Sequence, residues 1–237
     1  MSDLVHMSKK AIGWLYLYLF AGIADLVAIA KGLQEYRFFT KPLIIVSLGL
    51  FFYFTTQSIQ KSLLRKAVLA GLLFSMIGDF LLLFPDLFSY GLGAFLVTLI
   101  CYIIVFKLTQ NHQVNLRSVN FLKIFFYNLP IYLITAIVYF LINDHLYSLK
   151  IPVIIYMLTM ALMVIIARER FQRTNIQSFI QILAGAFLFM ISDSLLALDI
   201  FFQPIENGGV LIMGTYIMAQ LLIIMGIRSH LIHSPGK

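Results

Sequence analysis

Long apolar runs, separated by short polar clusters, follow one another along the whole chain. They occupy residues near 11–32, 41–58, 66–84, 87–108, 118–142, 149–167, 177–202 and 208–230. A helix needs roughly 20 apolar residues to cross the hydrocarbon core of a bilayer, and each run comes close to that length. The pattern therefore predicts an all-α integral membrane protein, a bundle of about eight transmembrane helices forming one polytopic membrane domain over residues 1–237.

The basic residues gather at one side of this predicted bundle. If the spans cross the membrane in turn, one side receives Lys9, Lys10, Lys61, Arg65, Lys66, Lys107, Arg117, Arg168, Arg170, Arg173, Arg228 and Lys237. The other side keeps mainly Lys31, Arg37, Lys41 and Lys150. Because Lys and Arg accumulate in cytoplasmic loops, both short tails, residues 1–10 and 231–237, are predicted to be cytoplasmic.

Composition supports the membrane assignment and excludes other classes. The chain is 61% hydrophobic and 11% charged, whereas soluble domains are about half apolar and about a quarter charged. Its net charge of +7 lies in the short loops, where charge sets membrane orientation, so nucleic acid is not an expected partner. The single cysteine, Cys101, lies within an apolar run, so neither a disulfide framework nor a thiolate metal site is expected.

Two related segments place an acid deep in an apolar run. Residues 76–82 read Met-Ile-Gly-Asp-Phe-Leu-Leu, and residues 190–196 read Met-Ile-Ser-Asp-Ser-Leu-Leu. Because an ionisable side chain in hydrocarbon is costly, Asp79 and Asp193 are predicted to be functional. The predicted topology puts both acids, together with Asp25, in the outer halves of their spans. The repeated motif also suggests two parallel four-helix halves related by an axis along the membrane normal.

Helical spacing indicates which way these acids point. Residues four apart share a helix face, so Asp79 lies on one stripe with Ser75 and Gly71. Asp193 lies on one with Ala197, Phe189 and either Gly185 or Ala186. Small residues let helices approach closely in lipid, so these stripes are predicted to face other helices.

Few other polar residues lie in the runs. Lys41 and Pro42 are predicted to open the second span at the outer surface. Tyr102, Tyr216 and Gln220 lie in later spans, where the tyrosines fit either a site or an anchoring and packing role. Asn128 is predicted to satisfy backbone groups freed by a kink at Pro130.

The residues within the spans restrict the possible chemistry. All five histidines (His6, His112, His145, His230 and His233) are predicted to lie in loops or tails, so a histidine-ligated metal and serine-histidine catalysis are not expected. A carboxylate pair remains, in which one acid donates a proton while the other stabilises a cation or activates water. The same pair would serve hydrolysis through an oxocarbenium-like cation, proton-coupled transport, intramembrane peptide hydrolysis or a structural role.

Several motifs in order resemble a known family. Residues 39–43 read Phe-Thr-Lys-Pro-Leu, residues 75–79 read Ser-Met-Ile-Gly-Asp, residues 93–95 read Gly-Ala-Phe, and residues 185–189 read Gly-Ala-Phe-Leu-Phe. With Pro85, Tyr102, Asp193 and Tyr216, this order is similar to that of the YhhN-like membrane proteins, which include the lysoplasmalogenases. The resemblance implies an eight-span enzyme without a cofactor that cleaves the vinyl ether bond of lysoplasmalogens to a fatty aldehyde and a glycerophospho-base. Alternatives are a proton-coupled carrier of a lipid or small solute, and a non-hydrolytic relative with a structural Asp pair.

The resemblance also assigns roles to residues. Asp79 and Asp193 would be catalytic, and a lysophospholipid-type substrate among the membrane lipids would contact Lys41, Tyr102, Tyr216, Asp25 and Gln220. Lys41 would either pair with the substrate phosphate or extend to lipid head groups.

Two positions depart from the expected family pattern. Histidines are expected three residues before Tyr102 and four residues after Tyr216, where this chain has Leu99 and Gln220. The expected location is the inner (plasma) membrane of a bacterium.

Overall fold

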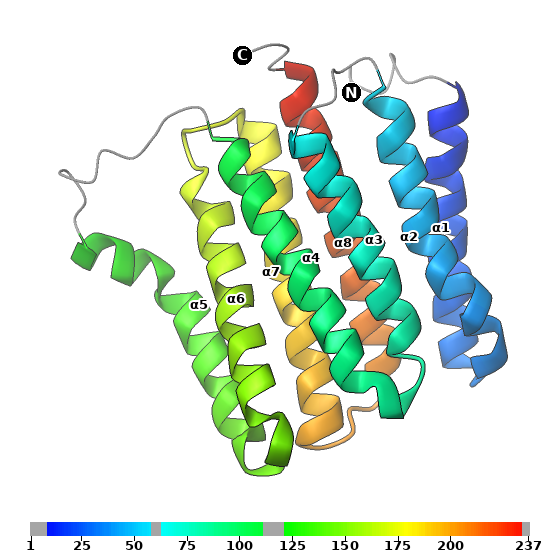
Figure 1. Ribbon diagram of the computed structural model, residues 1–237, viewed down its shortest axis with the longest axis vertical. Coiled ribbons are helices and arrows are strands. Elements are labelled where there is room, and N and C mark those ends of the chain that lie inside the picture. The colour runs from blue at the N-terminus through cyan, green and yellow to red at the C-terminus, as the bar shows by residue number, and fades with distance from the viewer. Residues whose placement is uncertain (1–8, 58–62, 111–120, 234–237) are drawn as a thin grey trace.

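The computed structural model describes residues 9–57, 63–110 and 121–233, and all long elements in these ranges are helices (Figure 1). They are α1 (Lys9–Ala30), α2 (Gln34–Thr55), α3 (Leu63–Leu81), α4 (Phe88–Leu108), α5 (Phe121–Ile142), α6 (Lys150–Glu169), α7 (Ile176–Phe201) and α8 (Gly208–His233). Short 3-10 turns, η2 (Pro85–Leu87), η4 (Asn143–His145) and η5 (Tyr147–Leu149), join neighbouring helices at one end of the bundle. The predicted all-α bundle is confirmed.

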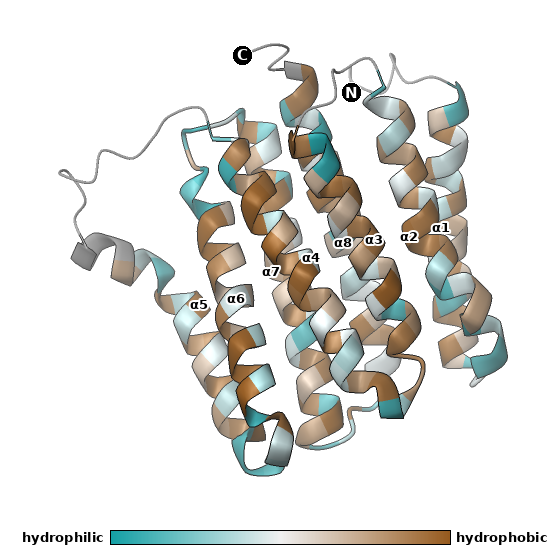
Figure 2. Ribbon diagram, in the orientation of Figure 1, coloured by the Kyte–Doolittle hydropathy of each residue, from teal (hydrophilic) through white to brown (hydrophobic). Residues whose placement is uncertain are grey.

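The helices have the length and polarity of membrane spans. Seven of those described are long and apolar enough to cross a membrane, and the exception, α3, carries Arg65, Lys66 and Asp79. Figure 2 shows apolar residues along the middle of the helices and polar residues concentrated near their ends. Large apolar side chains face outward, Phe20 at 69% and Phe140 at 79% exposure, as a lipid-facing surface requires.

The start of α2 corrects one prediction. The helix begins at Gln34, so Pro42 lies in its interior rather than in its first turn. Lys41 is accordingly buried within the bundle instead of opening a span at the surface. The residues before it form a polar first turn, and a helix that extends beyond the hydrocarbon needs no apolar residues there.

Seven helices are arranged around the bundle, each in contact with the next. Their order is α1, α2, α3, α4, α6, α7 and α8, and α8 returns to contact α1. The hydroxyl of Tyr18 on α1 donates a 2.5 Å hydrogen bond to the carbonyl oxygen of Ile217 on α8. Helix α5 lies at the edge of the bundle against α6 and α7 (Figure 1). The last helix in sequence therefore completes the arrangement begun by the first.

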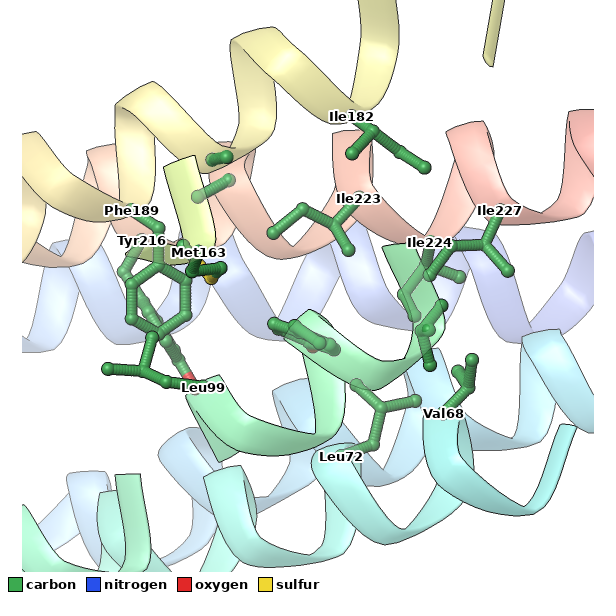
Figure 3. Packing of buried hydrophobic residues seen from close by; sticks show 14 of the residues in the cluster. Val68, Leu72, Leu99, Met163, Ile182, Phe189, Tyr216, Ile223, Ile224 and Ile227 are labelled. Atoms are coloured by element: carbon green, nitrogen blue, oxygen red, sulfur yellow. The ribbon is translucent and has the colours of Figure 1, made fainter. Parts of the chain in front are cut away.

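Helices α7 and α8 approach each other closely. A Cβ atom on Gly185 would lie 2.9 Å from the carbonyl oxygen of Ala219, and one on Gly226 would lie 3.0 Å from the backbone nitrogen of Ile182. Around this contact, buried side chains from α3, α4, α6, α7 and α8 form one apolar core (Figure 3). The predicted small-residue stripe through Gly185 thus does face another helix.

A buried arginine holds the opposite end of the bundle from the η turns. Arg170 donates hydrogen bonds to the hydroxyls of Thr109 (2.9 Å) and Ser178 (2.7 Å) and has no exposed surface. Burial lowers the pKa of Arg170 to about 9, so the guanidinium is still charged at neutral pH. Thr174 beside it shares a 2.9 Å hydrogen bond with Nδ1 of His230. The prediction that all histidines lie outside the spans is wrong for His230, because α8 continues to His233 and buries this ring.

Some predictions lie outside the described residues or are not tested. Residues 1–8 and 234–237 of the tails, the predicted cytoplasmic residues Lys61 and Arg117, and His112, predicted to lie in a loop, are outside the described ranges. The two parallel halves, the single domain and the orientation of the bundle across the membrane remain predictions.

Candidate functional site

A cavity of about 310 Å³ lies among helices α2 to α8. Its polar wall consists of Arg37, Lys41, Asp79, Thr135, Tyr156, Ser192, Asp193, Ser194, Asp199 and Tyr216. Its apolar wall includes Leu82, Phe88, Leu92, Phe95, Val138, Val153, Met157, Met160 and Met190. Both predicted catalytic acids therefore line the same cavity as an apolar surface that could hold a hydrocarbon chain.

Asp79 on α3 has a donor at each carboxylate oxygen. The Tyr216 hydroxyl on α8 donates a 2.7 Å hydrogen bond to Oδ2, and Nζ of Lys41 on α2 lies 3.4 Å from Oδ1. Asp79 is 2% exposed and Lys41 6%. A charge buried to this degree requires such partners, and here helices α2 and α8 supply them to the acid on α3.

Lys41 does not extend to the lipid surface. Its ammonium points into the bundle toward Asp79, so the alternative in which it reaches lipid head groups is wrong. The Pro-containing turn of α2 places Lys41 at the cavity wall.

Asp193 on α7 has a different partner. The hydroxyl of Tyr156 on α6 donates a 2.5 Å hydrogen bond to Oδ2 of Asp193. In the described part of the chain no Lys or Arg lies within ion-pair distance of Asp193. The two predicted catalytic acids thus differ in surroundings, since Asp79 has a cation and a phenol whereas Asp193 has a phenol alone.

Tyr156 was not among the residues predicted from the sequence to belong to the site. A signal was present, because Val153, Tyr156, Met160, Met163 and Ala167 recur at spacings of three and four and are all buried. A helix face with that periodicity points into the protein. The one polar group on such a face is a candidate partner for a buried acid.

A second polar network lies behind the cavity wall. Nε2 of Gln220 donates to the hydroxyls of Tyr216 (3.2 Å) and Ser75 (3.1 Å), and its Oε1 accepts a hydrogen bond from Tyr102. Tyr102 and Gln220 are not among the cavity-lining residues, so they meet the cavity through Tyr216. Both predicted tyrosines are buried inside the bundle, which rules out a role as interfacial anchors.

Leu99 occupies one of the two positions where the resemblance implies histidine. Its side chain is fully buried in the apolar core that includes Phe189 and Tyr216 (Figure 3). The other position, Gln220, is polar and belongs to the network with Tyr102. This chain therefore keeps hydrogen-bonding capacity at one of the two positions and replaces it with hydrocarbon at the other.

Asp25 lies next to the cavity but outside its wall. Its Oδ1 accepts a 2.7 Å hydrogen bond from Thr40 and lies 3.4 Å from Nε of Arg37. Asp25 contacts Thr40 and Asp79 contacts Lys41, the next residue of α2. The two acids therefore lie at the same level along α2, in agreement with the common depth predicted for them. Arg37, which the sequence did not single out, lines the cavity.

Two other polar residues have clear surroundings. Asp199 lines the cavity and accepts a 2.7 Å hydrogen bond from the backbone nitrogen of Ile205, which fixes the turn before α8. The side chain of Asn128 is fully buried, and neither its oxygen nor its nitrogen has a partner in the described residues. The prediction that Asn128 satisfies backbone freed at Pro130 is therefore wrong.

Metal ligands do not gather around these acids. In the described ranges no three side chains of His, Cys, Asp or Glu are grouped so that they could hold a metal ion. The polar wall of the cavity offers carboxylates, phenols, aliphatic hydroxyls, an ammonium and a guanidinium.

A polar cavity inside a bundle of apolar helices defines a polytopic membrane protein with a buried carboxylate site. The chain belongs to the YhhN family, which matches residues 36–227. It is 30% identical over 157 residues to a lysoplasmalogenase, TMEM86B, of Sus scrofa. The aligned region covers 66% of this chain and 61% of that relative, so the chain spans less than two thirds of the relative's length. No solved structure matches the chain.

Proposed function

We propose that the protein is a membrane hydrolase that cleaves the vinyl ether bond of lysoplasmalogens to a fatty aldehyde and a glycerophospho-base. The observation that carries this proposal is that Asp79 and Asp193 line one cavity together with a long apolar wall. The relative named as a lysoplasmalogenase supports the substrate class. A single-chain lipid would present its hydrocarbon to the apolar wall and its ether bond to the acids.

The different partners of the two acids support different roles. The Lys41 ammonium beside Asp79 stabilises a carboxylate there, whereas Asp193 has only the Tyr156 hydroxyl. In the proposed mechanism Asp193 is the proton donor and Asp79 is the base. Positioned groups of this kind contribute roughly 10²- to 10⁴-fold to rate.

The proposed reaction proceeds in two proton-transfer stages. Asp193 gives its proton to the vinyl carbon that does not bear the oxygen, leaving an oxocarbenium ion that the Asp79 carboxylate stabilises. Water adds to the carbon attached to oxygen and passes a proton to Asp79. This addition converts the oxocarbenium ion into a hemiacetal. Asp79 then protonates the glyceryl oxygen as that carbon–oxygen bond breaks, while Asp193 takes the hydroxyl proton. Aldehyde and alcohol leave, and both acids return to their starting forms.

The test is aldehyde release by purified protein in detergent or liposomes. Lysoplasmenylethanolamine is the substrate, and its 1-O-alkyl analogue is the control, because without the double bond no oxocarbenium ion forms. Asp79→Asn and Asp193→Asn are each expected to lower the rate at least about 100-fold. Asp86→Asn, which changes an exposed acid in η2, is the matched control and should keep full activity.

Two results would contradict the proposal. One is no aldehyde above background from a well-folded wild-type protein. The other is full activity in both aspartate variants. Ligand-dependent proton flux in liposomes with intact lipid on the far side would instead support a proton-coupled carrier.

A further inference from the structure

Two cations line the cavity, and both come from one face of α2. Arg37 and Lys41 are four residues apart, so they lie one helical turn from each other along the helix. Lys41 is already engaged, since its ammonium lies 3.4 Å from Asp79 and its side chain is 7% exposed. A lysine that neutralises a buried acid is poorly placed to bind a second anion.

Arg37 is held at a fixed orientation instead. Its Nε lies 3.4 Å from Oδ1 of Asp25, and its Nη1 donates a 3.3 Å hydrogen bond to Oε1 of Gln34. Thr40 donates to the same Asp25 oxygen at 2.7 Å. In the described part of the chain Nη2 of Arg37 has no hydrogen-bond partner. The guanidinium therefore keeps donor capacity while one edge is tethered.

The tether itself is hidden from any ligand. Asp25 has no exposed surface and does not line the cavity, whereas the Arg37 side chain is 15% exposed and does. Of the side chains that line the cavity, the one that Asp25 pairs with is Arg37. A planar guanidinium whose position is fixed in this way suits the oxygens of a phosphate group better than a flexible ammonium would.

From this geometry we propose that Arg37 binds the phosphodiester of a single-chain phospholipid, that Asp25 and Thr40 position it, and that Lys41 serves Asp79 rather than the phosphate. The identity of the lipid rests on the proposed function. Five covalent bonds separate the ether oxygen from phosphorus in such a lipid, a reach comparable to the helical turn of about 5.4 Å between Arg37 and Lys41. A phosphate on Arg37 therefore brings the ether oxygen to the level of Lys41 and Asp79.

Direct binding tests this without requiring turnover. Purified full-length protein in detergent is titrated with a non-hydrolysable 1-O-alkyl lysophosphoethanolamine and, separately, with the 1-O-alkylglycerol that lacks the phosphodiester. Arg37→Gln is expected to weaken the first at least about 10-fold, as the loss of a charged hydrogen bond does, and to leave the second unchanged. Arg37→Lys and Asp25→Asn should give smaller losses with the phospholipid only. Lys31→Gln, an exposed cation before α2, is the matched control and should bind both like wild type.

Four outcomes would overturn the assignment. They are an unchanged affinity of Arg37→Gln for the phospholipid, an equal loss for both ligands, a phosphate-specific loss in Lys41→Gln but not in Arg37→Gln, and no phospholipid binding by the wild type.

Soluble glycerophosphoethanolamine distinguishes a lipid head group from a free phosphodiester. If it binds the wild type as tightly as the phospholipid, the lipid assignment is wrong. A wild-type protein that binds as expected but releases no aldehyde contradicts the proposed function and leaves the role of Arg37 supported.

Discussion

The hydroxyl of Tyr216 donates a 2.7 Å hydrogen bond to Oδ2 of Asp79 and joins α8 to α3 across 137 positions of sequence. The Phe95 and Phe189 rings pack edge-to-face with the Tyr216 ring, with centroids 5.9 and 5.8 Å away. Gln220 donates to the same hydroxyl at 3.2 Å, which leaves the tyrosine proton free for Asp79. The phenol is therefore fixed in position and in the direction in which it donates.

Tyr216→Phe should lower both stability and aldehyde release. Removing a hydrogen bond to a buried charge costs about 1.5–3 kcal/mol, and the carboxylate would lose one of its two fixed donors. Thermal unfolding in detergent and the aldehyde assay measure the two effects. Tyr90→Phe, at a residue that is 69% exposed on α4, should change neither. Equal behaviour of the two variants would contradict a special role for Tyr216.

The Lys41–Asp79 pair should show strong coupling in a double-mutant cycle. Lys41→Met leaves a buried carboxylate without its cation, a loss of about 3–5 kcal/mol. Asp79→Asn made together with Lys41→Met removes the uncompensated charge, so the double variant should be more stable than Lys41→Met alone. Unfolding of the four proteins in one detergent measures the coupling energy. Additive effects would show that the two side chains do not interact.

The sequence was sufficient for the spans but not for the contacts between them. The apolar run predicted at 177–202 is the helix Ile176–Phe201, because the length of a span follows from the thickness of hydrocarbon. The start of α2 was predicted seven residues late, since Gln34, Glu35 and Arg37 resemble a loop when helices are read from hydrophobicity alone. A helix that extends beyond the hydrocarbon forms its own backbone hydrogen bonds whichever side chains it carries.

The acids of the candidate site could be predicted from the apolar runs, and Lys41 and Tyr216 from the family resemblance, but Tyr156 and Arg37 could not. Asp79 and Asp193 stand out because an acid in an apolar run is rare. Tyr156 did not, because a tyrosine in such a run is compatible with packing. Tyr156 contacts Asp193 and Tyr216 contacts Asp79 because of which helices are neighbours. Helical periodicity predicts which face of a helix is buried, but it does not predict which helix packs against that face.

The close approach of α7 and α8 predicts a graded response to added methyl groups. Gly185→Ala would put a Cβ 2.9 Å from the carbonyl oxygen of Ala219, so the helices must separate, at a cost of about 1–3 kcal/mol. Gly214→Ala on α8 meets nothing within 4 Å and should be neutral or stabilising, because alanine favours helix over glycine by about 1 kcal/mol. Thermal unfolding compares the two. A Gly185→Ala protein as stable as Gly214→Ala would refute this packing.

Arg170 is expected to matter for stability and not for chemistry. Arg170→Met removes the buried donors that bind Thr109 and Ser178, and each buried acceptor left without a partner costs about 1–3 kcal/mol. The melting temperature should fall while the rate per folded molecule is unchanged, because Arg170 does not line the cavity. Lys150→Met, at an exposed residue, provides the comparison and should retain the wild-type melting temperature. A selective loss of rate in Arg170→Met would contradict a purely structural role.

The contact of α8 with α1 and α3 has a consequence for how the protein is made. Ribosomes release α3, and with it Asp79, long before they reach Tyr216. Lys41 on α2 precedes Asp79 in the chain, so the cation of this pair is synthesised before the acid and the phenol of Tyr216 only long after it. The order of synthesis thus makes the cation of Asp79 available before its phenol. The cavity is complete only once α8 has been inserted.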